Sequence, residues 1–521
     1  MDPITSTFVI LAFAVIAFSS NRVPLGIVAM GVALALYFTG VLTFPEAVAG
    51  FGDPTVLFIA ALFVVSESLD STGVTAWAGQ KVIGSAGTKR TPLLLVICLL
   101  VAGLSALISV TGAVAALLPL VVVVASSAGI ASSQLLLPLA FAAHAGSLLF
   151  LTGSPVNIIV SDAAADAGGR TFSFFEFVLV GIPLLLGTVL IIVLFGRALL
   201  PLRAAAVMPT DLTRLTRRLK IDYDVTLDTK ILIGPTNGVS EVVIAPRSPL
   251  IGLRIFPGMS TPSGDLVILA ARRGADLLSG RDVTLRAGDA LLLQGTWDNL
   301  ALHTQRRDSV MVVDDPSALR RAVPLGKGAK RAMIILGLMV VLLATGLVPP
   351  AAAAMLAAGA LIVSGAVGVE QAYRSISWTT VVLVAGMIPL STAFLTTGAA
   401  DLVAGWLISV VGDSGPRIAL LAIVALTIVL GQIISNTATV LIVAPIAIAV
   451  AAGLEISVQP FMMALAIAGA ASFLTPIATP ANLMVMKPAG YQFGDYWKLG
   501  LPLVLLFSAV AVFYVPWIWP F

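Results

Sequence analysis

"LTGSPVNIIV" (151–160) and "LTPIATPANLMV" (474–485) place the same polar interruption in two apolar stretches of the chain. The shared elements are a hydroxyl residue, a proline and an asparagine, as Ser154-Pro155-x-Asn157 and Thr479-Pro480-x-Asn482. Proline has no N–H to donate to the preceding helical turn, so each stretch predicts a broken helix. Inside a membrane the freed backbone groups need new partners. Carbonyl and hydroxyl oxygens at such a break suit Na⁺, and half-helix N-termini favour anions.

The composition is that of a membrane protein. The chain has 521 residues, of which 59% are hydrophobic and 11% charged, whereas ordinary soluble domains carry about 25% charged residues. Several stretches are long and apolar enough to cross a bilayer. The first one follows "MDPITST", which has no basic region, so we expect a span rather than a cleaved signal peptide. The single cysteine, Cys98, excludes a disulfide framework, and the composition excludes a soluble-type enzyme.

A polar region divides two apolar halves, 1–200 and 331–521. Residues 201–330 hold 18 of the 29 Lys and Arg residues and 13 of the 26 Asp and Glu residues. Short β-rich runs such as "SEVVIAPRSPLIGLRI" are separated there by Gly, Pro and Asp, as in a small soluble domain. We therefore predict an α+β domain inserted between two membrane repeats.

The two halves resemble each other at an offset near 325 residues. Pro24 matches Pro349, and "SVTGAVAALLP" matches "SNTATVLIVAP" with Asn157 and Asn482 following in the same order. We predict an all-α membrane part with five spans and one re-entrant hairpin in each half. The spans are 5–20, 24–42, 55–71, 133–165 and 177–198, then 331–348, 350–367, 377–395, 458–486 and 497–519; the hairpins are 91–127 and 418–451. An odd number of crossings makes the repeats inverted, as in many secondary transporters.

The positive charges predict an orientation. Lys81, Lys89 and Arg90 precede the first hairpin, and the basic region 201–330 follows the fifth span. The positive-inside rule then places both termini outside and the soluble domain inside.

Three further polar residues lie in apolar surroundings. Glu67 falls late in the third span and is a candidate proton site, whereas Asp70 is expected at the solvated interface. His144 precedes the first break, and we expect it to be a hydrogen-bonded packing residue rather than a proton relay.

These features resemble the divalent anion/sodium symporter family, which includes dicarboxylate, citrate and sulfate carriers of the ion transporter superfamily. The resemblance is carried by "GFGDPTVLFIAALFVVSESLDSTGV", "LTGSPVNIIV", "SNTATVLIVAP" and "TPIATPANLMV". The insert resembles a TrkA-C domain, the ligand-binding C-terminal part of potassium-conductance regulators. The resemblance implies an elevator-type homodimer in a bacterial inner membrane, with Na⁺ as the coupling ion and a small ligand for the cytosolic domain.

The resemblance also implies site residues. For the first sodium site they are Ser105, Ser109, Val110, Thr152, Gly153 and Ser154; for the second, Gly431, Asn436, Thr475, Ala478 and Thr479. For the substrate they are Ser109, Val110, Thr111, Ser435, Asn436 and Thr437, with Asn157 and Asn482 nearby. The first motif, Ser109-Val110-Thr111, lacks the asparagine amide of the second.

The function that we predict is sodium-coupled symport of a small divalent anion, with H⁺ as the other candidate coupling ion. Sulfate or a similar oxyanion is favoured and a dicarboxylate comes next, with regulation by the cytosolic domain. Expected partners are the anionic substrate, the lipid bilayer and a second copy of the chain, with no nucleic acid. One alternative is a cation/proton antiporter of the same superfamily, which needs a catalytic Glu67. Another is a ligand-gated potassium channel, suggested by the insert, although no "TVGYG" filter run occurs.

Overall fold

The computed structural model forms two compact units. Unit 1 comprises Met1–Glu67, Val82–Met208 and Ile334–Phe521, and unit 2 comprises Ser68–Lys81 and Pro209–Met333. The structure describes residues 2–20, 22–84, 87, 89–203, 223, 234, 237–261, 263–274, 276–278, 283–304, 310–313, 325–326, 328–411 and 415–521.

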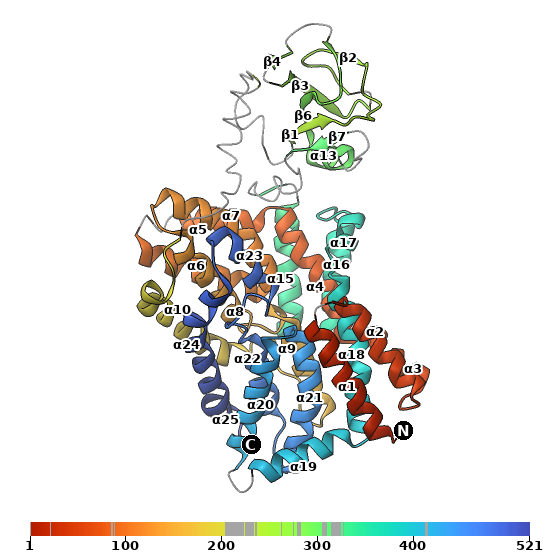
Figure 1. Ribbon diagram of the computed structural model, residues 1–521, viewed down its shortest axis with the longest axis vertical. Helices are drawn as coiled ribbons and strands as arrows, with labels where there is room; N and C mark the ends of the chain where they lie inside the picture. The colour runs from red at the N-terminus through yellow and green to blue at the C-terminus, as the bar shows by residue number, and fades with distance from the viewer. Residues whose placement is uncertain are drawn as a thin grey trace. The chain divides into compact units, whose positions relative to one another are not determined.

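Apolar helices make up unit 1 (Figure 1), although the segments Ser68–Lys81 and Ala329–Met333 of the helices named below belong to unit 2. In the first half of the chain they are α1 (Pro3–Ser20), α2 (Leu25–Phe38), α3 (Phe44–Val48), α4 (Pro54–Ser71), α5 (Val74–Gly84), α6 (Arg90–Leu107), α7 (Val110–Ser127), α8 (Leu136–Gly146), α9 (Pro155–Asp166) and α10 (Val178–Leu199). In the second half they are α15 (Ala329–Thr345), α16 (Pro350–Val363), α17 (Val369–Ser375), α18 (Trp378–Thr396), α19 (Ala399–Val411), α20 (Pro416–Gly431), α21 (Asn436–Gly453), α22 (Gln459–Ala470), α23 (Pro480–Ala489), α24 (Tyr496–Ala509) and α25 (Val515–Ile518). A π-helical turn, Val510–Tyr514, joins the last two.

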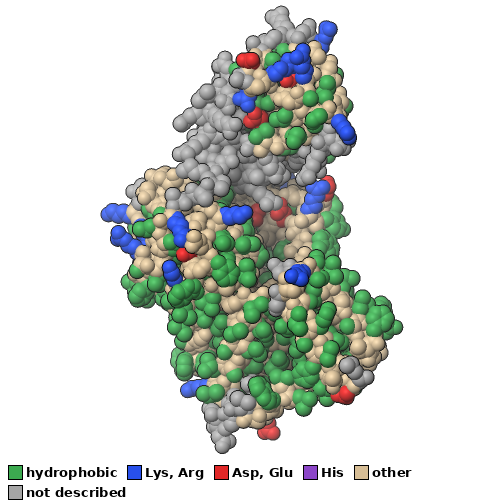
Figure 2. Space-filling view, viewed as in Figure 1, with side chains coloured by type: hydrophobic (Ala, Val, Ile, Leu, Met, Phe, Trp, Pro, Cys, Tyr) green, Lys and Arg blue, Asp and Glu red, His purple; other side chains and the backbone are tan. Residues whose placement is uncertain are grey.

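Seven stretches of helix in the described part of the chain are long and apolar enough to cross a membrane. Five further apolar helices have 10–17 residues. The visible face of unit 1 is covered mainly by hydrophobic side chains, with Lys and Arg toward one end (Figure 2). The prediction of a polytopic membrane protein is thereby supported.

The helices of the second half follow the same order as those of the first. Leu25 and Pro350 begin α2 and α16, Pro54 and Trp378 begin α4 and α18, and Val110 and Asn436 begin α7 and α21. The short helices α3, α5, α17 and α19 were not among the predicted elements, because 5 to 13 residues are too few for a span. Each recurs at the corresponding place in the other half.

Both predicted broken helices are interrupted. Helix α8 ends at Gly146 and α9 begins at Pro155, so that residues 147–154 form the first break. Helix α22 ends at Ala470 and α23 begins at Pro480, so that residues 471–479 form the second break. The two prolines therefore do not interrupt a helix from within. They occupy the first helical positions after each break, where a missing N–H removes no helical hydrogen bond.

Two helical hairpins point their turns at these breaks. Helices α6 and α7 meet at the first tip (108–111), and α20 and α21 meet at the second tip (432–437). In Figure 1, α6 and α7 lie in the upper part of unit 1, whereas α20 and α21 lie in its lower part. Helices α6, α7 and α21 have 18 residues each, a length that also suits a full crossing, so the re-entrant assignment remains a proposal.

Close backbone contacts hold a further helix against each break. A Cβ added at Gly181 of α10 would lie 2.3 Å from the carbonyl oxygen of Leu148, and one at Gly500 of α24 would lie 2.2 Å from that of Phe473. Only glycine permits this approach at either position. Packing therefore explains the glycine of "GIP" (181–183) and the glycine of "GLP" (500–502).

Unit 2 contains a five-stranded antiparallel sheet. Its order is β4 (Asp276–Leu277), β3 (Leu266–Arg273), β6 (Ala290–Thr296), β1 (Asn237–Ile244) and β7 (Val310–Val312). Strands β2 (Arg254–Ile255) and β5 (Val283–Thr284) form a separate pair, and α13 (Trp297–Thr304) packs on β1, β6 and β7. Buried residues such as Val242, Leu292 and Trp297 form its core.

Ion pairs also stabilise unit 2. Arg273 donates to both carboxylate oxygens of Asp289, at 2.7 and 2.8 Å. Burial disfavours the ionised form of Asp289, but the hydrogen bonds from Arg273 and from the backbone N–H of Arg286 outweigh it and lower its pKa. Many of the charged residues counted in 201–330 lie outside the described residues.

Candidate transport site

The two breaks are held open by matched asparagines. The Nδ2 of Asn157 donates to the carbonyl oxygens of Ser147 (2.8 Å) and Phe150 (3.0 Å). The Nδ2 of Asn482 donates to those of Ser472 (2.7 Å) and Thr475 (3.1 Å). Both asparagines are completely buried. Each amide therefore supplies the donors that the interrupted helix has lost.

The other half of each amide is available as an oxygen ligand. Among the described residues, the Oδ1 atoms of Asn157 and Asn482 have no hydrogen-bond donor. Buried amide oxygens are usually satisfied, so these two oxygens at equivalent positions have unused acceptor capacity.

Threonines tie each break to a hairpin tip. The Oγ1 of Thr152 donates to the carbonyl oxygen of Ala106 at 3.1 Å, and the Oγ1 of Thr475 donates to that of Gln432 at 3.3 Å. These bonds bring together the tips and breaks that the sequence predicts for the two sodium sites. The side chain of each threonine thus links its break to the neighbouring helical hairpin.

Four helices begin at the tips and breaks with a hydroxyl residue as N-cap. Ser109 accepts from the N–H of Gly112 (3.1 Å) and Ser435 from that of Ala438 (3.3 Å). At the breaks, Ser154 accepts from the N–H of Val156 (3.2 Å), and Thr479 from that of Asn482 (3.3 Å). The segments also cross over between halves: α9 packs on α21 and α22, and α23 packs on α7 and α8. The positive ends of four helix dipoles therefore lie at the two tips and the two breaks.

The remaining predicted site residues lie in the same region. Ser105 is buried and donates to the carbonyl oxygens of Ala102 (3.1 Å) and Ala143 (2.8 Å). A Cβ added at Gly153 would lie 2.3 Å from the carbonyl oxygen of Ser147, so this glycine is required by the tight first break. A Cβ at Gly431 would lie 3.9 Å from the Oδ1 of Asn436. Ala478 is buried within the second break, and Val110, Thr111 and Thr437 begin the helices that leave the tips.

The second tip has polar contacts that the first lacks. The Oγ of Ser472 donates to the Oδ1 of Asn436 at 2.6 Å. In the first half the equivalent of Asn436 is Val110, and the Oγ of Ser147 bonds the carbonyl oxygen of His144 in its own helix at 2.8 Å. The sequence difference between the tips, Val110 against Asn436, is therefore accompanied by a difference in the neighbouring serine: Ser472 bonds the tip, whereas Ser147 bonds its own helix.

Sequence reasoning missed two glutamine contributions. Gln432 spans the second break, because its Nε2 donates to Ala471 O (3.2 Å) and its Oε1 accepts from Leu474 N (3.1 Å). Gln134 lies two residues before α8, and Gln459 begins α22. Gln134 donates to the carbonyl oxygen of Leu200 (3.1 Å), and Gln459 donates to that of Arg170 (2.6 Å). Gln134 and Gln459 lie 325 residues apart, so a closer comparison of the two halves would have found this pair.

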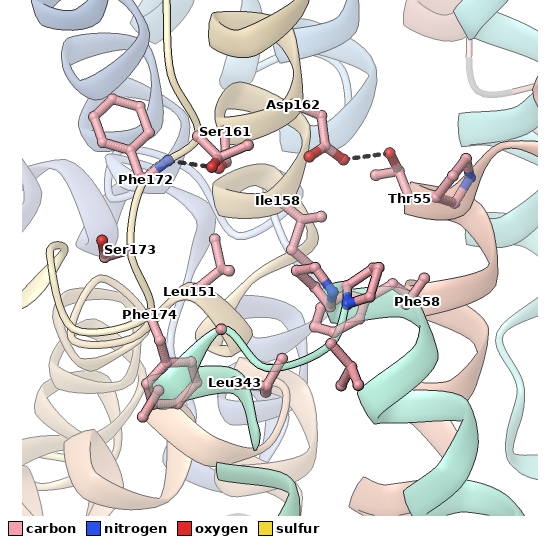
Figure 3. A pocket seen from close by; sticks show the side chains of 18 of the residues that line it. Thr55, Phe58, Leu151, Ile158, Ser161, Asp162, Phe172, Ser173, Phe174 and Leu343 are labelled. Atoms are coloured by element: carbon pink, nitrogen blue, oxygen red, sulfur yellow. Dashed lines mark hydrogen bonds between the residues drawn. The ribbon is translucent and has the colours of Figure 1, made fainter. Parts of the chain in front are cut away.

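It also missed an acidic residue beside a cavity. The Oγ1 of Thr55, at the start of α4, donates to the Oδ2 of Asp162 of α9 at 2.6 Å (Figure 3). This pair lines a cavity of about 560 Å³ that reaches Leu151 and Ile158 beside the first break. The same two residues line a second cavity of about 260 Å³, together with Asp53 and Asp166. Neither cavity is lined by the tip residues, so these spaces lie beside the predicted substrate site.

Glu67, the candidate proton site, accepts a hydrogen bond from the Nε2 of Gln371 of α17 at 2.9 Å. His144 is buried, as expected for a packing residue, and its Nε2 lies 3.1 Å from the Oγ1 of Thr479. No group of three or more His, Cys, Asp or Glu suited to a metal occurs among the described residues.

Comparison with known proteins identifies the class to which this fold and site belong. The family model of the citrate transporters (CitMHS) matches residues 13–468 and 395–521. The chain is a member of this family, within the ion transporter superfamily that also holds the divalent anion/sodium symporters. It is therefore a transporter and not an enzyme.

Individual relatives agree with this assignment. An uncharacterized transporter of Escherichia coli K12, YfbS, is 30% identical, with 98% of each chain covered. Sodium/sulfate cotransporter 2 of Chlamydomonas reinhardtii is 27% identical over 52% of this chain and 32% of its own length. The crystal structure of the YdaH transporter of Alcanivorax borkumensis has a similar fold, with a TM-score of 0.50 at 15% identity, covering 94% of this chain and 90% of that one.

Proposed function

We propose that this protein is a secondary active transporter that couples Na⁺ to the symport of a small divalent anion at the two tips and two breaks. The observation that carries the proposal is that four helices begin at the tips and breaks, each capped by Ser or Thr. Helix N-termini favour anions through their free N–H groups and their dipoles. Cations bound beside a divalent anion at the tips and breaks would also stabilise it electrostatically.

The oxygens of the breaks suit Na⁺. Hydroxyl, amide and carbonyl oxygens surround each break, and the Oδ1 atoms of Asn157 and Asn482 lack donors among the described residues. The ligands that we propose for the first ion are Ser105, Ser109, Thr152, Gly153 and Ser154, and for the second Gly431, Asn436, Thr475, Ala478 and Thr479. The resemblance to sodium/sulfate cotransporters supports the same coupling ion.

The difference between the tips favours a compact substrate. A dicarboxylate has two separated charged groups, which two equivalent tips would bind equally well. Here Asn436 supplies an amide at the second tip only, and Val110 stands at the first. A compact tetrahedral oxyanion such as sulfate can be bound mainly at one polar tip, and it is therefore preferred over succinate and citrate.

Uptake into proteoliposomes tests this function. Labelled sulfate, succinate, citrate and rubidium would each be offered with an inward sodium gradient and with choline replacing sodium. We expect sodium-dependent sulfate uptake above the other three. Sodium-independent uptake, or uptake of rubidium alone, would contradict the proposal.

The repeats are proposed to be inverted in a bacterial inner membrane, with both termini outside, and the hairpins to be re-entrant. The equivalent helix order of the halves and the placing of the two hairpins in opposite parts of unit 1 support this (Figure 1). Such a pair of halves suits alternating access by an elevator motion in a homodimer. Reporter fusions at Phe521 and at Gly238 are expected on opposite sides of the membrane. Finding both on one side would end the inverted arrangement.

Unit 2 is proposed to be a cytosolic regulatory domain that binds a small ligand, as its TrkA-C resemblance implies. Every tip and break residue lies in unit 1, so binding of the substrate does not need unit 2. Replacing 211–310 by a flexible linker should leave substrate binding intact and change the uptake rate. Loss of binding in a folded deletion variant would contradict this role.

A further inference from the structure

His144 belongs to the first half of the chain but contacts the second break. It lies in the last turn of α8, and only 3% of its surface is exposed. Its Nε2 is 3.1 Å from the Oγ1 of Thr479, a residue 335 positions away. The ring packs edge-on against Phe473 with centroids 5.9 Å apart. Phe473 therefore holds the imidazole ring in place, and the Nε2 atom of the ring faces Thr479 of the second break.

The same turn of α8 is tied to the first break through its backbone. The carbonyl oxygen of Ala143 accepts from Ser105, that of His144 accepts from Ser147, and that of Ser147 accepts from Asn157. One helical turn thus contacts both breaks, the first through carbonyls and the second through the imidazole.

The hydroxyl of Thr479 has one donor and two acceptor positions. One acceptor position is used by the backbone N–H of Asn482 at 3.3 Å. If the imidazole donated to the same oxygen, both acceptor positions would be filled and none would remain for a cation. If the imidazole accepts, the hydroxyl proton points to Nε2 and one lone pair of Thr479 stays free.

We propose that His144 is a positioning residue for the second sodium site, and that its Nε2 accepts the hydroxyl proton of Thr479 so that the oxygen of Thr479 can bind Na⁺. This inference rests on the proposed sodium coupling and adds a residue that no tip or break motif contains. The first break has no equivalent, because the position matching His144 is Gly469. A Cβ there would lie 2.9 Å from the Cγ2 of Val440, so the first break has no room for such a side chain.

The test measures sodium binding itself, without a substrate. The melting temperature of the full-length purified protein is followed against NaCl, with choline chloride keeping the ionic strength constant. His144→Leu keeps an apolar body but removes the acceptor, and we expect its half-saturating sodium concentration to rise about tenfold. His144→Gln places an amide oxygen near the position of Nε2 and should stay within about threefold of the unmodified protein.

A matched control separates packing from positioning. Phe141 lies one turn earlier on α8 and packs on the same Phe473 ring, with centroids 5.0 Å apart. Phe141→Leu should lower the melting temperature without sodium but leave the half-saturating concentration within about threefold. If Phe141→Leu and His144→Leu shift that concentration equally, the role of His144 is packing and the proposal is overturned.

A double-mutant cycle tests whether His144 acts through Thr479. In a Thr479→Val background, His144→Leu should add less than about twofold to the half-saturating concentration. A further tenfold loss would show that the ring acts through another group, such as the Asn482 side chain, with which His144 also interacts, and would overturn the inference.

The unmodified protein separates this inference from the proposed function. If sodium raises its melting temperature but His144→Leu responds in the same way, only the role of His144 fails. If sodium does not stabilise the unmodified protein, the proposed sodium coupling fails, and this inference fails with it.

Discussion

The two breaks of unit 1 share their backbone hydrogen bonds and differ in the polar side chains around them. In both, an asparagine donates to carbonyls 10 and 7 residues earlier, and a threonine bonds the neighbouring tip. The second break alone has His144, Gln432 and the Ser472–Asn436 pair beside it. The shared residues maintain the shape of a break, whereas the others distinguish the second break from the first. A repeat can therefore keep a symmetric fold and acquire a one-sided site.

The largest effect is expected from the two asparagines. Asn157→Ala and Asn482→Ala each strand two buried carbonyls, at about 1–3 kcal/mol per unsatisfied group. Each variant should therefore lose roughly 2–6 kcal/mol of stability, and the two losses should be similar because the bonds are equivalent. Melting temperatures in detergent check this. A variant that melts like the unmodified protein would show that its break does not depend on the asparagine.

Gln432→Ala should cause the next largest loss of stability, and this loss should have no counterpart in the first half of the chain. It removes the bonds to Ala471 O and from Leu474 N, and the equivalent residue in the first half is Ala106. We expect a stability loss of about 1–3 kcal/mol in total, less than for the asparagines because Gln432 and Leu474 are only partly buried. The control is Gln432→Glu, which keeps the acceptor for Leu474 N and loses the donor. Equal melting temperatures for the alanine variant and the unmodified protein would show that the second break needs no additional support.

Asn436→Ala should weaken sodium-dependent substrate binding by about tenfold, which corresponds to about 1.4 kcal/mol. It removes the amide of the second tip and leaves the buried hydroxyl of Ser472 without its 2.6 Å acceptor. Thr479→Ala should act similarly, mainly through sodium. A sodium titration of substrate affinity measures both. Unchanged affinity in Asn436→Ala would remove the second tip from the site.

Val110→Ala should have the smallest effect, less than about threefold on the same affinity, because it removes no polar group. The same sodium titration checks it beside Asn436→Ala. If Val110→Ala is as damaging as Asn436→Ala, the first tip makes a specific apolar contact with the substrate. The assignment of recognition to the second tip would then be wrong.

Much of the membrane part could be predicted because its causes are local. Hydropathy and span length indicate membrane helices, and proline followed by asparagine indicates a break wherever the chain folds. The short helices α3, α5, α17 and α19 were missed, because 5 to 13 residues are too few for a membrane span. Pro155 and Pro480 were expected to interrupt a helix, but each is the first residue of a new helix. The new helix starts there because Ser154 or Thr479 caps it.

The sequence by itself determined that two apolar halves carry equivalent breaks and tips, and that the tips differ at Val110 and Asn436. Only the tertiary structure decided which groups meet at those places. The contact of His144 with Thr479 joins residues 335 apart, and that of Thr55 with Asp162 joins residues 107 apart. The physical reason is that a missing N–H or an apolar stretch acts within one helical turn, whereas a hydrogen bond between distant residues exists only after helices have packed at a particular distance and rotation.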